Sequence, residues 1–145
     1  MMTTFMAGSA DIPVMPVDIS QGMPGKLVGL LLEVVEGSTQ PFIIADPSGL
    51  IAGCNSAFCK LIGYSKGELI SRHVADLTPV EWRERESAII AGQVKSKMPA
   101  IYTKEYICKG GARIPVELYD HVIYDKAGHP LYFYAFVTDL GRKDR

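Results

Sequence analysis

The chain has 145 residues, and 48% of them are hydrophobic. That length fits one domain, and the apolar content is enough for one core. Charge is nearly balanced, with 15 Lys and Arg against 16 Asp and Glu. Without a large basic field to neutralise phosphates, the composition argues against nucleic acid as a direct partner.

Three cysteines, Cys54, Cys59 and Cys108, occur without a C-x-x-C spacing. An odd, scattered set does not build a disulfide framework or a zinc ribbon. The N-terminal segment lacks the charged and apolar regions of a signal peptide. The most hydrophobic window, residues 27–35, is far shorter than the ~20 residues that a membrane span requires. We therefore predict a cytoplasmic protein with no membrane span.

Residues 1–25 are rich in Pro and Gly without a sustained period, which predicts a flexible arm. Residues 26–36 (KLVGLLLEVVE) predict a helix that ends at Gly37, within a flanking segment that extends to residue 38. Its apolar residues cover most of the circumference, so the helix needs cover on two sides. One side would pack on its own domain and the other on a second copy; the alternative is a helix fully buried in one core. The expected dimer contacts are Leu27, Leu30, Leu31, Val34 and Val35.

Beyond this segment, residues 39–145 predict a compact core. Residues 41–46 and 50–54 predict two strands, joined by a type I turn at D-P-S-G. Asn55 is placed to cap a short helix over residues 56–62 that Gly63 closes. Capping boxes begin at Ser65 and at Thr78, and the second predicts a helix that runs to about Val94.

Three further strands are predicted over residues 99–108, 113–124 and 131–138. Gly110 and Gly111 suggest a two-residue hairpin loop between the first two. That loop would set Glu105 opposite Val116 on the inner face, with Lys104 on the other face. The element order predicts an α+β domain with a five-stranded antiparallel sheet, helices on one face and the N-terminal flanking helix.

An ordered set of residues over roughly residues 39–143 resembles the PAS domain family. The first half of the set is Ile44, Ala45, Asp46, Gly49, Ile51, Asn55, Ala57, Phe58, Leu61, Gly63, Tyr64, Ser65, Glu68, Leu69, Val74, Asp76 and Leu77. The second half is Gly111, Ile114, Pro115, Val116, Glu117, Asp125, Gly128, Phe136, Val137, Thr138, Asp139 and Leu140. No single element of the set is specific, but the order and spacing together are.

The resemblance implies a sensory, signal-transducing module rather than an enzyme. PAS domains sit upstream of effectors such as histidine kinases, cyclases and transcription regulators, and they commonly form homodimers through a helix before the core. The chain also lacks the P-loop, G-x-G-x-x-G and G-x-S-x-G patterns, so we predict no catalytic residues. The family tends to end in Asp-Ile-Thr and a basic pair, whereas Gly141 stands here at the Thr position.

Cofactors known in PAS relatives find little support in the sequence. Flavin photosensors use a cysteine in an Asn-Cys-Arg-Phe-Leu pattern, and residues 71–76 (SRHVAD) contain none. Haem-binding relatives place a His on the long helix, which has none here, and His73 lies before it. His121 and His129 form no cluster with acids or thiols, so we predict no metal site. The cofactor, if any, is left unassigned.

A small apolar or amphipathic ligand is left as the candidate, between the inner face of the sheet and the short helices. The expected lining residues are Ile44, Phe58, Leu61, Leu77, Ile89, Thr103, Glu105, Val116 and Leu118. Glu105 is the most specific of them, since a buried carboxylate needs a partner or a raised pKa. The alternative is that these residues simply fill the core of a protein-interaction PAS domain that binds no ligand.

Overall fold

The computed structural model describes residues 24–141. The predicted N-terminal arm falls outside the described residues, except for Pro24 and Gly25, which open the first helix. Within the described part, no helix is both long and apolar enough to cross a membrane. The elements are α1 (Pro24–Val35), β1 (Phe42–Ala45), β2 (Ile51–Cys54), α2 (Ser56–Ile62), α3 (Lys66–Leu69), the 3-10 helix η2 (Val74–Leu77), α4 (Val80–Ser96), β3 (Ala100–Ile107), β4 (Arg113–Tyr124) and β5 (Pro130–Asp139).

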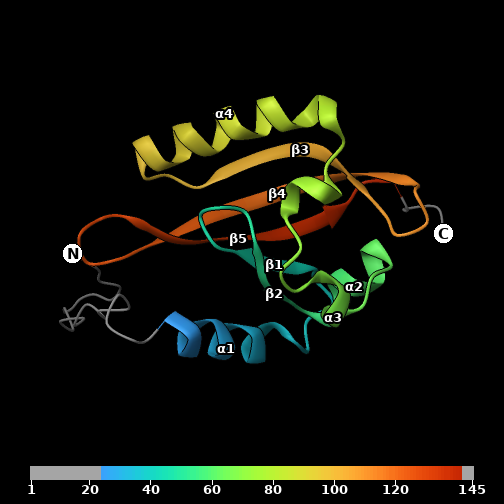
Figure 1. The fold of residues 1–145 in the computed structure, drawn as a ribbon, viewed down its shortest axis with the longest axis horizontal. Coiled ribbons are helices and arrows are strands. Elements are labelled where there is room, and N and C mark those ends of the chain that lie inside the picture. The colour runs from blue at the N-terminus through green and yellow to red at the C-terminus, as the bar shows by residue number, and fades with distance from the viewer. Residues whose placement is uncertain (1–23, 142–145) are drawn as a thin grey trace, which may run out of the picture.

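The five strands form one sheet in the order β2-β1-β5-β4-β3, and every neighbouring pair is antiparallel. The predicted fold class is confirmed. In Figure 1 the two longest helices flank opposite edges of this sheet, α4 beside β3 and α1 beside β2. The short helices α2 and α3 lie near β1 and β2.

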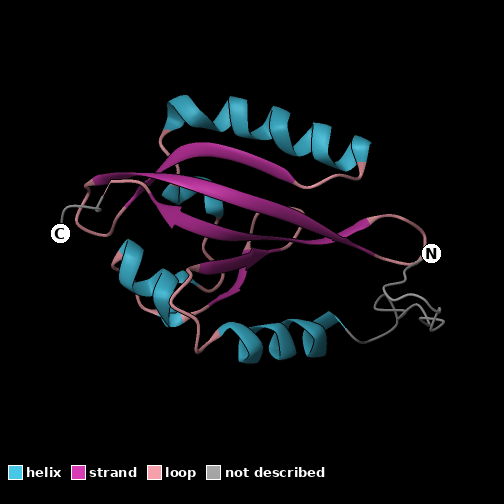
Figure 2. Cartoon of the chain, turned by 180° about the vertical axis from the view of Figure 1, so that it is seen from behind, coloured by secondary structure: helices cyan, strands magenta, loops and turns pink. Residues whose placement is uncertain are grey.

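Two apolar clusters occupy the two faces of the sheet. The larger one packs the inner face against α2, α3 and η2, with Phe58, Leu77 and Val116 almost fully buried. The smaller one packs α1 on the outer face through Val28, Val35 and the strand residues Phe42 and Ile44. Figure 2 shows α1 separated from α4 by the sheet. The helices α1 and α4 therefore pack on different faces of the sheet.

The local predictions around Asn55 are confirmed. Its side chain accepts a hydrogen bond from the Phe58 amide and caps α2, and Gly63 ends that helix at a φ of 86°. The capping box at Ser65 is also present, with Glu68 as its acidic partner. Sequence-local hydrogen bonds decide these features, which is why they were predictable.

The predicted register of the β3–β4 hairpin is wrong by one residue. Glu105 pairs with Pro115 and Lys104 pairs with Val116. Only Gly111 of the two glycines has a positive φ, of 96°, and the Cys108 amide bonds the Ala112 carbonyl. These are the features of a three-residue loop, whereas a two-residue type I′ loop needs two positive φ angles. The shift moves every β3 side chain to the face opposite the predicted one.

The second predicted capping box is also wrong. Helix α4 begins at Val80 after Pro79, and no side chain caps it. The Thr78 hydroxyl instead donates to the Val74 carbonyl at 3.2 Å and accepts from Lys104. A long-range partner has thus replaced the local cap.

Candidate functional site

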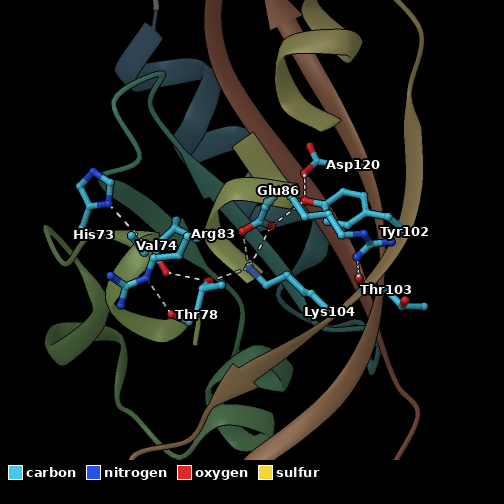
Figure 3. Close-up of polar contacts among 11 residues, drawn as sticks. His73, Val74, Thr78, Arg83, Glu86, Tyr102, Thr103, Lys104 and Asp120 are labelled. Atoms are coloured by element: carbon cyan, nitrogen blue, oxygen red, sulfur yellow. Dashed lines mark hydrogen bonds and ion pairs between the residues drawn. The ribbon is translucent and has the colours of Figure 1, made fainter. Parts of the chain in front are cut away.

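A buried polar cluster lies where α4 crosses the middle of β3. The Lys104 side chain is only 1% exposed, and its Nζ lies 2.8 and 2.9 Å from the two Glu86 carboxylate oxygens. The same Nζ donates to the Thr78 hydroxyl at 2.7 Å. Figure 3 shows these side chains converging from η2's end, α4 and β3. An ion pair this deeply buried requires all of its hydrogen bonds to be satisfied.

Asp120 on β4 adjoins this pair through Tyr102. The Tyr102 hydroxyl lies 2.7 Å from Glu86 Oε2 and 3.3 Å from Asp120 Oδ2 (Figure 3). Gln93 of α4 donates to the Asp120 backbone carbonyl at 2.8 Å. Asp120 is 6% exposed, and its Oδ1 has no hydrogen-bond partner among the described residues.

Burial dominates the protonation behaviour of this cluster. It raises the pKa of Asp120 to about 7, and the nearby Glu86 carboxylate acts in the same direction. Burial lowers the pKa of the Lys104 ammonium, which Glu86 opposes. Burial also raises the pKa of Tyr102 far above its ordinary value, so this phenol stays protonated. Each shift has the sign expected for a charge removed from water.

A cavity of about 370 Å³ opens beside the cluster. Its walls come from β1, β4, β5, η2, α4 and the turn between β1 and β2. Apolar side chains dominate the walls, including Ile43, Ile90, Leu118 and Phe133, and Glu86 and Asp120 provide acidic groups. The volume is within the range of small-molecule sites.

His73 stands at the rim of this cavity. Its ring occupies the space that a Cβ on Gly49 would fill, at 2.4 Å, and Gly49 has a φ of 98°. Its Nδ1 accepts from the Ala75 amide at 3.3 Å and so caps η2. The β1–β2 turn is thereby held against η2, and His73 has a structural role at the cavity rim.

Five of the predicted lining residues, Phe58, Leu61, Leu77, Val116 and Leu118, are buried in the inner-face cluster. Ile89 packs against that cluster from α4. Of these six only Leu118 lines the cavity. Phe58, Leu61, Leu77 and Val116 lie in the packed core, and Ile89 is partly buried beside it.

The remaining three predicted lining residues lie elsewhere. Ile44 is fully buried, but in the outer-face cluster under α1. Thr103 is exposed, and the Glu105 side chain is 31% exposed. Glu105 accepts from Trp82 Nε1 at 3.0 Å and lies 3.5 Å from Arg113. The register shift explains both β3 corrections. Glu105 and Trp82 together link α4 to the outer side of β3.

Lys104 and Asp120 were missed as site residues. A pattern pointed to Asp120, because it continues the inward alternation of Ile114, Val116 and Leu118 along β4. Lys104 lies between Tyr102 and Tyr106 in the corresponding alternation of β3. Ile101 and Ile107 occupy the alternate positions of β3, so both faces of this strand carry apolar residues. Alternation alone therefore did not show which face is buried.

The predicted contact residues of α1 divide between two environments. Leu30 and Val34 are exposed, at 59% and 72%. Val35 is buried against the chain's own sheet, and Leu27 and Leu31 are half-buried. The helix also approaches β2 closely, since a Leu32 methyl lies 2.4 Å from where a Cβ on Gly53 would stand. The predicted packing of one side of the helix on its own domain is confirmed.

A family model described as PAS domain matches residues 39–141, most of the chain. The chain belongs to the PAS domain family. Among curated proteins no similar sequence is found. The recognised resemblance is thus confirmed by a match that covers both halves of the residue pattern.

Solved PAS structures share this fold. The PAS domain of a Colwellia psychrerythraea protein is 17% identical, with a TM-score of 0.72 over 81% of this chain and 99% of that one. The Rhodobacter sphaeroides LOV protein is 18% identical, with a TM-score of 0.72 over 83% and 71%. A PAS domain from a two-component sensor histidine kinase is 14% identical, with a TM-score of 0.62 over 79% and 96%. At these identities the likeness establishes the fold alone.

Proposed function

We propose that this PAS domain is a sensory module that binds a small molecule in the cavity beside Asp120 and relays the event to a signalling effector. The cavity is the observation that carries the proposal. It is walled by the sheet on one side and by α4, η2 and the β1–β2 turn on the other. A molecule held there contacts elements that are far apart in sequence, so its binding can alter how they pack.

The relay requires that the molecule bind two packing arrangements with different affinity. Helix α4 is attached to the sheet by polar links, namely Glu86 to Lys104, Trp82 to Glu105 and Gln93 to Asp120. A molecule that competes for Asp120 or Glu86 changes these links directly. The response then passes to β4 and β5, which pair with each other and lead to the C-terminal end of the described chain.

We further propose that the module acts as a homodimer through α1. Leu30 and Val34 present apolar surface to solvent, while the opposite side of the helix packs on the outer face of the sheet. A second copy would cover these two side chains. The effector, such as a histidine kinase or a transcription regulator, and the cytoplasmic setting are part of the same proposal.

An NMR titration with a library of small metabolites tests the binding step. Ala45, Ala91 and Leu118 line the cavity, and their amide signals should shift with at least one compound. Ser87→Trp, at an exposed α4 position on the cavity wall, should abolish the shifts. Ala88→Trp is the matched control, because Ala88 is also exposed on the same helix but does not line the cavity.

Shifts that persist in Ser87→Trp, or a library with no member that shifts these amides, would contradict ligand sensing. The protein-interaction PAS domain without a ligand would then be the better account.

A further inference from the structure

We propose that the cavity selects a small organic cation, an apolar body that carries an ammonium group, and that Asp120 is the residue that pairs with the ammonium. This inference rests on the proposed function, since it names the class of molecule that the cavity takes. It is carried by a charge imbalance, an unsatisfied carboxylate oxygen and the apolar character of the walls.

The charges around the cavity do not balance. Three carboxylates, Asp46, Glu86 and Asp120, line the cavity together with one cation, Arg83. Lys104 does not line it but pairs with Glu86. Asp46 belongs to the β1–β2 turn, where its Oδ1 accepts from Ser48 and from the Leu50 amide. When Asp120 is ionised, above about pH 7, the site is therefore one positive charge short, and the shortage falls at Asp120 because Lys104 pairs with Glu86.

The other titratable groups around Asp120 do not supply this charge. They are His73 before η2, the phenols of Tyr102 and Tyr106 on β3, and Tyr134 on β5. Burial raises the pKa of all three phenols, which keeps them neutral. His73 lies on the cavity wall away from this cluster, where its Nδ1 accepts a hydrogen bond from the Ala75 amide. The Lys104 charge acts on Asp120 from nearby, but its hydrogen bonds go to Thr78 and Glu86, so a cation paired directly with Asp120 would come from another molecule.

Hydrogen-bond valence shows which carboxylate is short of donors. Lys104 supplies both oxygens of Glu86, and Glu86 Oε2 also receives the Tyr102 hydroxyl at 2.7 Å. A phenol has one proton, so the 3.3 Å contact from Tyr102 to Asp120 Oδ2 cannot be a second full donation. Asp120 Oδ1 has no donor among the described residues. Asp120 is thus a buried carboxylate on the cavity wall with free acceptor capacity, and an ammonium supplies three donors.

The walls favour an organic cation over a hydrated metal ion or an anion. Ile43, Ile90, Leu118 and Phe133 line the cavity, and the described residues contain no group of three metal ligands. An anion would be desolvated next to Glu86 and Asp120, whose like charges repel it. An apolar body with one ammonium instead buries hydrocarbon against these walls and neutralises the excess carboxylate.

Three probes of one shape and different charge test the proposal: 2-phenylethylamine as the cation, 2-phenylethanol as the neutral isostere and phenylacetate as the anion. Calorimetry on the full chain gives the affinities, and the cavity amides locate the binding. We expect the amine to bind at least tenfold more tightly than the alcohol at pH 8, and phenylacetate to bind more weakly still. Asp120→Asn should reduce amine affinity at least tenfold and leave alcohol affinity within twofold.

Glu117→Gln is the matched control, because it makes the same chemical change on the same strand at an exposed, outward position. It should leave all three affinities within twofold. The wild-type pH profile is a second test that does not depend on any variant folding. Since a proton competes with the amine for Asp120, amine affinity should rise about tenfold from pH 6 to pH 8, while alcohol affinity should stay flat.

Amine binding no tighter than alcohol binding, no loss in Asp120→Asn, or no amine shift at the cavity amides would each overturn the assignment to a cation. If the alcohol or phenylacetate then shifts the cavity amides in a Ser87→Trp-sensitive way, ligand sensing stands and only the cation class fails. If the metabolite library also fails, the proposed function falls with it.

Discussion

The two faces of the PAS sheet are built from different chemistry. The face under α4 buries Lys104 and Asp120 and holds its helix by directed hydrogen bonds. The face under α1 holds its helix by apolar packing around Phe42 and Ile44, with aromatic rings of β5 beside them. Of the two buried charged residues in the described part of the chain, neither belongs to that outer cluster. A charged molecule can therefore act on the α4 face, whereas the α1 face responds to shape and apolar area.

The difference between the two faces predicts that the largest loss of stability follows substitution of Lys104. Lys104→Met removes the buried cation and leaves the Glu86 carboxylate without its ion-pair partner, so we expect a loss of about 3–5 kcal/mol in the free energy of unfolding at pH 7. Urea denaturation measures it. Lys109→Met is the matched control, since Lys109 pairs with Glu68 at 2.7 Å where both side chains are well exposed, and should lose less than about 1 kcal/mol. Equal losses would contradict the distinction between the buried cluster and the surface.

Asn55 connects the two faces and should have the next largest effect. Its Oδ1 accepts from the amides of Phe42 and Phe58, and its Nδ2 donates to the carbonyls of Val35 and Gln40, all within 3.0 Å. Asn55→Ala leaves these backbone groups without hydrogen-bond partners. We therefore expect the free energy of unfolding, measured by urea denaturation, to fall by about 2–3 kcal/mol.

Ser65→Ala removes the exposed cap of α3 and is the control for losing a cap alone, with an expected loss of about 0.5–1 kcal/mol. A similar loss in both variants would mean that Asn55 acts only as a helix cap, without joining α1 to β1.

Local chemistry made most of the fold predictable. The caps at Asn55 and Ser65 and the turn at Asp46 involve neighbours in sequence, and each was predicted. The strand alternation of β4 was equally visible, since its apolar residues recur at every second position from Ile114. The resemblance to PAS domains followed from such local features in the correct order.

The candidate site depended on one geometric choice that local chemistry left open. Two adjacent glycines allow a two-residue or a three-residue hairpin loop, and the choice decides whether Lys104 or Glu105 points inward. Both phases of β3 carry apolar residues, Ile101 and Ile107 on one and Tyr102 and Tyr106 on the other. Only the long-range partners of Lys104, which are Thr78 and Glu86, select the register. Those partners are 26 and 18 residues away, which is why the buried cluster was missed.

The pH dependence of the unfolding free energy tests the inner face of the sheet, which buries Asp120. Burial raises the pKa of folded Asp120 to about 7, above its ordinary value of 3.8, so the folded state holds a proton that the unfolded state releases. This stabilisation is complete below about pH 4 and is lost as the pH rises through 7. Relative to Asp120→Asn, wild type should lose about 2 kcal/mol of unfolding free energy between pH 5 and pH 8. Denaturation curves at both values measure it.

Glu117→Gln, on the exposed side of β4, should follow wild type at both pH values. The difference in unfolding free energy between wild type and Asp120→Asn should change with pH. If it stays constant, or if wild type gains stability from pH 5 to pH 8, then Asp120 is not a buried carboxyl that is protonated in the folded state.

The smallest effect on stability is expected at the exposed side of α1. Leu30 and Val34 are 59% and 72% exposed, so Leu30→Ser with Val34→Ser should change the unfolding free energy of the monomer by no more than about 0.5 kcal/mol per site. Val28→Ala, on the buried side of the same helix, should lose about 2 kcal/mol. In sedimentation velocity the double serine variant should shift the protein toward monomer, whereas Val28→Ala should leave the association of the folded protein intact. Because the side chains of α1 attach it to the sheet by apolar packing, substitutions at its solvent-facing and sheet-facing positions separate association from folding. An unchanged sedimentation coefficient in the double variant would remove this helix side from the proposed dimer.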